Sequence, residues 1–179
     1  MPDFDPAVAL TAAARGDQSA WESIVATYSG LVWSVARGYR LDPAAAADVF
    51  QGTWLRLVEH LGDIRDGERL GGWLATTARR EALGLLRRTR DLPMDNISEM
   101  TDTSEQAAAA ADEDLLRSED QRTLWAAFAK LPEGCQRLLR LLFADQPASY
   151  LDISAALDMP MGSIGPTRSR CLASLKTLL

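Results

Sequence analysis

The residues best suited to bind a charged partner lie near the end of the sequence, after a short apolar segment. Tyr150–Leu157 can form a two-turn helix, and we expect 158–162 to interrupt it because Pro160 and Gly162 disfavour helical continuation. Ser163 is the expected N-cap of a second helix, with Gly165 and Pro166 in its first turn. The apolar stripe of this helix comprises Ile164, Cys171, Leu172, Leu175, Leu178 and Leu179, and Thr167, Arg168, Ser169, Arg170 and Lys176 lie largely outside it.

A helix held by its apolar side that offers guanidinium and hydroxyl groups outward can read base edges in the major groove of DNA or bind phosphates. An ordinary helical hairpin with a solvated basic face fits the same spacing. The rest of the chain must therefore decide between the two.

The charge is unevenly distributed along the 179 residues, whose net charge is -6. Most of the excess acid lies in 91–120, which contains a single arginine, Arg117, so the rest of the chain is basic. With 47% hydrophobic residues, the chain is expected to fold. It has no phosphate-binding loop motif, no metal-ligand spacing and no nucleophile beside a base, so we expect neither an enzyme nor a cofactor. The single histidine, His60, is expected to be structural.

The two cysteines, Cys135 and Cys171, lie in helix-like apolar patterns without the spacing of a disulfide framework. We expect buried free thiols in a reducing compartment, with a redox pair as the less favoured alternative. No apolar run approaches the length of a membrane span, and 1–17 lacks the features of a secretion signal, so a cytoplasmic protein without membrane insertion is expected.

The first half of the chain reads as a series of helices. Asp5-Pro6, Asp17 and Asp42-Pro43 predict three helix starts, and Gly16 predicts the end of the first helix. The third helix should bury Val49, Phe50, Trp54, Leu57, Val58 and Leu61, and turn Asp48, Gln51, Thr53 and Arg56 outward. A loop at 62–69 should precede a helix over 70–90, which buries Trp73, Leu74, Ala78, Ala82, Leu85 and Leu86 and exposes Arg79, Arg80, Arg87, Arg88 and Arg90.

The second half follows an acidic, alanine-rich segment that we interpret as a flexible linker. A helix over 114–130 should carry Leu115, Leu116, Leu124, Trp125 and Phe128, and Leu131-Pro132-Glu133 should separate it from the next helix. The expected fold is all-α: two small helical bundles, 1–90 and 114–179, joined by the linker 91–113, with a helix-turn-helix in the second bundle.

The order of these motifs resembles the bacterial RNA polymerase sigma factors of the sigma-70 family, extracytoplasmic-function group. The resemblance rests on GDQSAWESIVATYSGLVWSVA, DVFQGTWLRL and GGWLATTARREALGLLRR in the first half, and on LPEGCQRLLRLLF, SYLDISAALDMPMGSI and RSRCLASLK in the second. It implies that 1–90 is like sigma region 2 and 114–179 is like sigma region 4.

The resemblance also implies site residues. Asp48, Gln51, Thr53, Leu55 and Arg56 would bind the clamp helices of the largest polymerase subunit, and the second bundle would meet the flap of the second-largest subunit. Asp63, Ile64, Arg65, Asp66, Arg79, Arg80, Arg87 and Arg88 would bind and melt the −10 element. Ser163, Thr167, Arg168, Ser169, Arg170 and Lys176 would read the −35 element, and an anti-sigma factor is an implied inhibitor.

The sequence departs from the family pattern at several of these positions. Ala47 and Gly52 stand where acids are usual in the polymerase-binding helix, and Arg80, Glu81 and Gly84 replace other residue types in the helix over 70–90. Gly165, Pro166 and Thr167 replace basic or serine residues, so Arg168 is expected to supply a contact in their place. The alternative function is a dimeric helix-turn-helix regulator that binds a palindromic site without polymerase.

Overall fold

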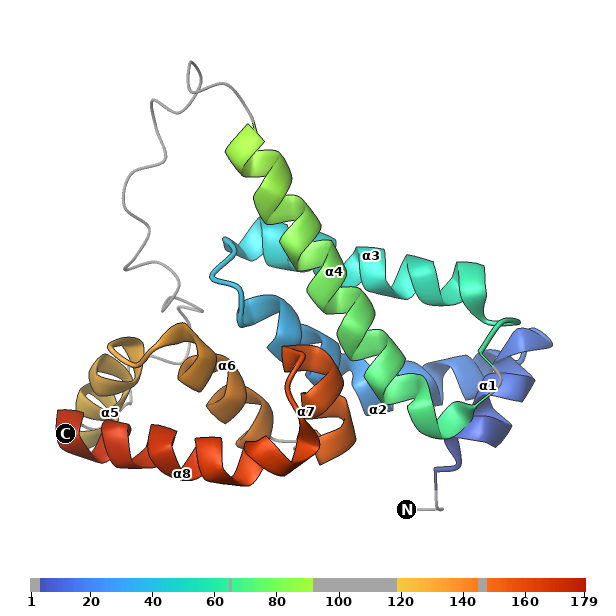
Figure 1. Cartoon of the computed structure of the whole chain (residues 1–179). Helices are drawn as coiled ribbons and strands as arrows, with labels where there is room; N and C mark the ends of the chain where they lie inside the picture. The colour runs from blue at the N-terminus through green and yellow to red at the C-terminus, as the bar shows by residue number, and fades with distance from the viewer. Residues whose placement is uncertain (1–3, 65, 92–118, 145–147) are drawn as a thin grey trace.

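The computed structural model describes residues 4–64, 66–91, 119–144 and 148–179, and in these ranges every regular element is a helix (Figure 1). The first half contains α1 (Pro6–Ala14), α2 (Gln18–Arg37), α3 (Pro43–His60), the short 3-10 helix η1 (Gly67–Arg69) and α4 (Leu70–Asp91). The second half contains α5 (Glu119–Ala129), α6 (Glu133–Leu142), α7 (Tyr150–Leu157) and α8 (Met161–Leu178). The expected all-α class is confirmed.

Aspartate caps start the first three helices, as the sequence predicts. The Asp5 and Asp17 carboxylates each accept two hydrogen bonds from backbone N–H groups of the following turn, and Asp42 accepts one from the Ala45 N–H. In Asp17, the bond from the Ala20 amide, helped by the Ser19 hydroxyl, lowers the pKa of the carboxyl group. Gly16 lies in the turn between α1 and α2 and has a φ of 90°, a conformation that glycine adopts without strain.

The core of the first half lies between α2, α3 and α4. Ile24, Val32, Leu57, Leu74 and Ala78 are fully or almost fully buried there. Edge-to-face contacts link Trp21 to Trp54, Trp54 to Phe50 and Phe50 to Trp33, which fixes how α2 packs on α3.

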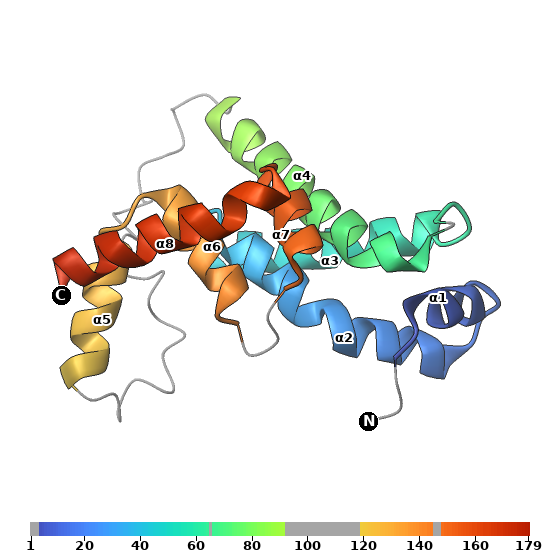
Figure 2. The same ribbon diagram turned by 60° about the horizontal axis from the view of Figure 1, so that its bottom comes forward.

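The second half packs directly on the first. In both views α7 lies against α4, and α6 also contacts α2, so the buried side chains of the two halves form one continuous cluster (Figures 1 and 2). Two glycines of α4 allow this approach: a Cβ on Gly71 would fall 2.5 Å from the Asp152 carboxylate, and one on Gly72 would touch Ala155 at 3.5 Å. Ile153 and Ala156 of α7 are fully buried. The domain boundaries 1–90, 91–113 and 114–179 stay predictions.

The turn between α7 and α8 corrects the expected start of the last helix. Asp158 reverses the chain with a φ of 55°, and α8 begins at Met161 after Pro160. Ser163 lies inside the first turn, where its backbone N–H and hydroxyl both donate to the Pro160 carbonyl. Pro166 is therefore inside the helix, which tolerates it because the carbonyl left without an N–H donor belongs to exposed Gly162.

The cysteines correct a second expectation. Cys135 of α6 and Cys171 of α8 form a disulfide with their Cα atoms 5.4 Å apart, so neither thiol is free. The two cysteines are therefore bonded to each other, as only the less favoured alternative allowed. The packing of α6 on α8 brings these residues together although they are 36 positions apart.

Several apolar residues also differ from expectation in exposure. Val58, Leu178 and Leu179 are exposed by 55%, 40% and 62%, although their spacing predicted inward positions. Leu115, Leu116 and all but the first residue of the acidic linker lie outside the described residues. Among the described helices, none combines the length and hydropathy that a membrane crossing requires.

Candidate functional sites

The outer side of α3 carries an exposed stripe of mixed character. Asp48, Gln51, Leu55 and Val58 follow one another at three- and four-residue steps, and all four are exposed. Leu55 and Val58 expose 65% and 55% of their surface, although the same helix buries Val49 and Leu57. Such a stripe, apolar at one end and polar at the other, fits the surface of a protein partner.

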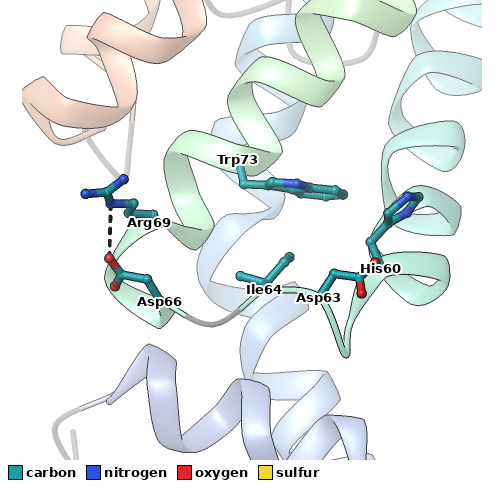
Figure 3. A pocket seen from close by; sticks show the side chains of 6 residues that line it. All are labelled: His60, Asp63, Ile64, Asp66, Arg69 and Trp73. Atoms are coloured by element: carbon teal, nitrogen blue, oxygen red, sulfur yellow. Dashed lines mark ion pairs between the residues drawn. The ribbon is translucent and has the colours of Figure 1, made fainter.

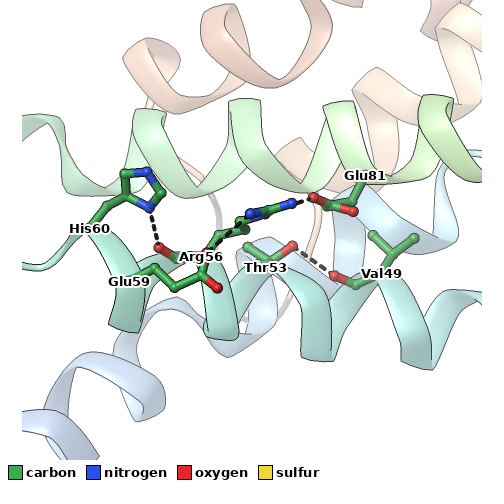
Figure 4. A network of polar contacts seen from close by, with 6 residues as sticks. All are labelled: Val49, Thr53, Arg56, Glu59, His60 and Glu81. Atoms are coloured by element: carbon green, nitrogen blue, oxygen red, sulfur yellow. Dashed lines mark hydrogen bonds and ion pairs between the residues drawn. The ribbon is translucent and has the colours of Figure 1, made fainter.

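Thr53 does not belong to this stripe. Its side chain is fully buried, and its hydroxyl donates to the Val49 carbonyl at 2.7 Å within the same helix (Figure 4). The expectation that Thr53 faces outward is wrong. Its hydroxyl makes a hydrogen bond within its own helix and therefore needs no contact with water, so the side chain can be buried with its methyl group in the core.

Arg56 pairs with two carboxylates, Glu59 of its own helix α3 and Glu81 of α4. Its Nη1 lies 3.0 Å from Glu59 Oε2, and its Nε lies 3.4 Å from Glu81 Oε1 on α4 (Figure 4). These hydrogen bonds, first that to Glu59, raise the pKa of the guanidinium group. About half of the side chain remains exposed, so Arg56 is positioned by its neighbours and still accessible.

A hollow of about 320 Å³ opens between the end of α3 and the start of α4. Its lining side chains come from α3, the following loop, η1 and α4: His60, Asp63, Ile64, Asp66, Arg69 and Trp73 (Figure 3). The His60 and Trp73 ring centroids are 6.1 Å apart, and Arg69 pairs with Asp66 at 3.0 Å. The hollow therefore offers flat rings, an apolar side chain and hydrogen-bonding groups together.

The loop that forms one wall of the hollow is braced from behind. Gly67 is buried against α1, and a Cβ at this position would collide with the Ala7 backbone. The Asp66 carboxylate accepts the Glu68 N–H at 3.1 Å, which starts η1. Of the predicted loop residues, Asp63, Ile64 and Asp66 line the hollow, and Arg65 lies outside the described residues.

Three residues of the hollow, His60, Trp73 and Arg69, were not expected from the sequence to be site residues. His60 was expected to be structural, and it does bind the backbone, with Nδ1 2.9 Å from the Arg56 carbonyl. Its ring is nevertheless exposed at the end of α3. The available signal was the placement of an aromatic or imidazole side chain on each side of a short loop between two amphipathic helices.

The arginines of α4 divide into two groups. Arg80, Arg87 and Arg88 are exposed, as predicted. Arg79 is not free: its side chain is only 26% exposed, and Nη2 lies 2.9 Å from Asp158 Oδ2 at the end of α7. In this arrangement Arg79 is paired with a residue of the other half, and its contact with DNA stays a prediction. The side chain of Arg90 is not described.

The outer face of α8 keeps the predicted basic character. Arg168, Ser169, Arg170 and Lys176 are exposed, whereas Ser163 and Thr167 are half-buried. Arg170 donates to the Thr167 hydroxyl at 3.1 Å, which orients the guanidinium along the helix. The described residues contain no cluster of His, Cys, Asp and Glu that could hold a metal ion.

Comparisons with known proteins agree with this geometry. Residues 24–91 match the family model of sigma-70 region 2. The chain is 26% identical over 176 residues to a probable RNA polymerase sigma factor, RfaY, from Xanthomonas campestris pv. campestris, covering 95% of this chain and 43% of that protein.

The fold is also similar to that of CnrH, solved in complex with the cytosolic domain of CnrY. The TM-score is 0.63 at 20% identity, and the match covers 97% of this chain and 96% of CnrH. The α2 to α4 unit thus matches region 2, and the whole arrangement of helices recurs in a solved structure. Residues 24–91 therefore belong to the sigma-70 region 2 family, and the chain as a whole is similar to RNA polymerase sigma factors.

Proposed function

We propose that this protein is an initiation factor that binds core RNA polymerase and directs it to two-part promoters. The observation that carries the proposal is the presence of three exposed faces on three different helices: a mixed stripe on α3, arginines on α4 and a basic face on α8. One protein contact and two separate nucleic-acid contacts are what such a factor needs.

The stripe on α3 is the proposed polymerase contact. Asp48 and Gln51 supply hydrogen bonds, and Leu55 and Val58 supply apolar area that is otherwise exposed to water. Arg56, held by Glu59 and Glu81, presents a fixed charge at its edge. The clamp helices of the largest subunit are the proposed partner, and the flap of the second-largest subunit is the proposed partner of the second half.

The hollow beside α4 is the proposed site for a base of the −10 element. Unstacking a base costs a few kcal/mol, and stacking on an aromatic ring such as Trp73 returns a similar amount. Arg80, Arg87 and Arg88 would hold the phosphates of the same strand. Strand opening is then driven by binding energy alone.

The outer face of α8 is the proposed reader of the −35 duplex. Arg168 and Arg170 are exposed near its middle, and Ser169 lies between them. Pro166 and Gly165 offer no donor side chain, so the contacts shift toward the middle of the helix.

The packed arrangement has a consequence for this function. In the packed arrangement Asp158 of the second half competes with the −10 strand for Arg79, so DNA binding is favoured when the two halves move apart. An anti-sigma protein that keeps them together would inhibit the factor. The complex of CnrH with the cytosolic domain of CnrY supports a partner of this kind.

Run-off transcription with purified core polymerase and a promoter library tests the proposal. The expected result is promoter-specific transcripts that require the added protein. A symmetric dimer that binds a palindromic duplex without polymerase would instead identify the alternative regulator.

A matched pair of variants tests the polymerase contact. Replacing Asp48 and Gln51 with alanine should reduce co-purification with core polymerase by about tenfold, since both side chains are exposed and their loss leaves the fold unchanged. Arg15→Ala, on the distal end of α1, is the control. Unchanged co-purification of the Asp48→Ala, Gln51→Ala variant would reject the contact.

A further inference from the structure

Four arginines from the two halves meet where the end of α2 contacts α6. Arg37 is the last residue of α2, Arg40 lies in the turn that follows it, and Arg137 and Arg140 come from α6; we call these four the seam arginines. Gly38 makes room for them, because the Arg137 side chain passes 3.0 Å from where a Cβ of residue 38 would stand. None of the sites predicted from the sequence includes any of the four.

Aromatic rings hold three of the four guanidinium groups. Arg37 lies 5.9 Å from the Trp33 ring centroid, Arg137 lies 5.0 Å from that of Tyr39, and Arg140 lies 5.1 Å from that of Phe128. A guanidinium stacked on a ring keeps its charge and most of its hydrogen-bond donors, so these groups are fixed in place without being neutralised.

The charge of the seam arginines is compensated only in part. Glu133 lies 3.6 Å from Arg40 and 4.0 Å from Arg137, and no carboxylate of the described residues pairs with Arg37 or Arg140. Burial lowers the pKa of Arg140, and the nearby charges of Arg37 and Arg40 lower it further. Four like charges and one acid at a partly buried position are unfavourable unless an anion binds.

A carboxylate fits this position better than a nucleic-acid backbone. Glu133 already shows the geometry by which a carboxylate bridges two of the seam arginines. The Arg137 side chain is only 27% exposed and Arg140 is half-buried, so a slender side chain reaches them more easily than a wide duplex does. Since the four arginines belong to both halves, the cluster exists only while the halves are packed together.

We propose that the seam arginines form a docking site for a carboxylate-rich segment of a partner protein. Binding there removes the charge repulsion between α2 and α6 and therefore stabilises the packed arrangement. In that arrangement Asp158 occupies Arg79, so an acidic partner at the seam opposes the DNA contact of α4 without touching it.

Fluorescence anisotropy with a labelled oligo-glutamate peptide and the full chain tests this site. The variant Arg37→Gln, Arg140→Gln should bind the peptide about tenfold more weakly, because two charge-assisted contacts are lost. Arg37→Gln alone removes an exposed side chain and one of the repelling charges, so it should weaken binding severalfold without lowering the melting temperature. Arg15→Gln, which removes one charge far from the seam, should bind like the wild type.

Two results would overturn the proposal. One is peptide affinity that falls equally in Arg15→Gln and Arg37→Gln, since the peptide would then respond to net charge alone. The other is a labelled DNA duplex whose affinity falls in Arg37→Gln while the peptide is bound as before, since the seam would then be a nucleic-acid contact. Neither measurement involves polymerase, so the outcome is independent of the proposed initiation activity.

Discussion

The hydroxyl of Tyr28 lies where the two halves meet. Burial, followed by the charges of Asp152 and Glu68, raises its pKa to about 12. Because the folded pKa exceeds that of the unfolded chain, this group's contribution to the free energy of unfolding is complete below about pH 10 and is lost as the pH rises toward 12. Stability should therefore fall with rising pH in this window.

Replacing Tyr28 with phenylalanine removes that ionisation. Urea unfolding between pH 9 and pH 12 should show a smaller loss of stability for Tyr28→Phe than for the wild type. Tyr150→Phe, which removes an exposed hydroxyl, is the matched control and should follow the wild type. Parallel curves for Tyr28→Phe and the wild type would contradict the assignment.

Thr53 and Leu55 are two positions apart on α3 but should respond in opposite ways. Thr53→Asp places a charge in the core and should cost about 3 kcal/mol or more of unfolding free energy. Leu55→Asp changes an exposed side chain and should alter stability by less than about 0.5 kcal/mol, while reducing polymerase binding. Urea unfolding and co-purification distinguish the two, and a stable Thr53→Asp variant would refute the burial argument.

The exposure of side chains could be predicted from the sequence wherever local spacing decides it. Asp48 and Gln51 are exposed, as expected, because the period of α3 turns them outward. Thr53 escaped prediction because a threonine can satisfy its hydroxyl within its own helix, and the residue type does not reveal that choice. Arg79 escaped because its partner, Asp158, comes from the other half of the chain.

The disulfide connects the proposed reading helix to α6. It closes a loop with a sequence separation of 36. By the chain-entropy relation, a cross-link of this size stabilises the folded state by about 4 kcal/mol. Thermal unfolding of Cys135→Ser, Cys171→Ser should therefore show a lower melting temperature than the wild type, with the second half affected first.

Dithiothreitol provides the control for that variant. Reductant should lower the melting temperature of the wild type and leave Cys135→Ser, Cys171→Ser unchanged. A wild type that melts at the same temperature with and without reductant would mean that the bond contributes nothing to stability.

The helices were predictable largely because their ends are marked. Aspartate before proline or a polar turn starts α1, α2 and α3 at the expected residues. The start of α8 was misplaced because Asp158, a non-glycine residue, supplies the left-handed reversal, and Gly162, which was expected to interrupt the helix, lies inside α8. A pattern of residue types predicts the presence of a turn more reliably than it predicts which residue adopts the left-handed conformation.

The packing of α7 on α4 should depend on the small size of Gly71. Gly71→Leu places a side chain where Asp152 stands and should separate the halves. Small-angle scattering should then show a larger radius of gyration, and a single-stranded −10 oligonucleotide should bind severalfold more tightly because Arg79 is released. The oligo-glutamate peptide should bind more weakly, since the seam is no longer assembled.

Gly84 of the same helix offers a matched control. A Cβ there meets nothing within 4 Å, so Gly84→Leu should leave the scattering profile unchanged. Identical profiles for Gly71→Leu and the wild type would show that the interface tolerates the side chain and does not keep the halves together through this contact.

The arrangement of the two halves was beyond sequence reasoning. A linker of the predicted length permits many orientations, and the residues that select one are individually unremarkable: Gly71, Gly72 and Ala155. Each is an ordinary residue in a helix when its sequence context is considered alone. The interface forms only because these small residues of α4 and α7, which are far apart in sequence, face one another.

Gly67 links the shape of the hollow to α1, which does not line it. Since α1 rests directly on this residue, deleting or displacing the first turn of α1 would free the wall formed by Asp63, Ile64 and Asp66. If the hollow takes a base as proposed, a protein shortened at this end, or one with a bulky amino-terminal fusion, should show lower promoter selectivity than the chain described above.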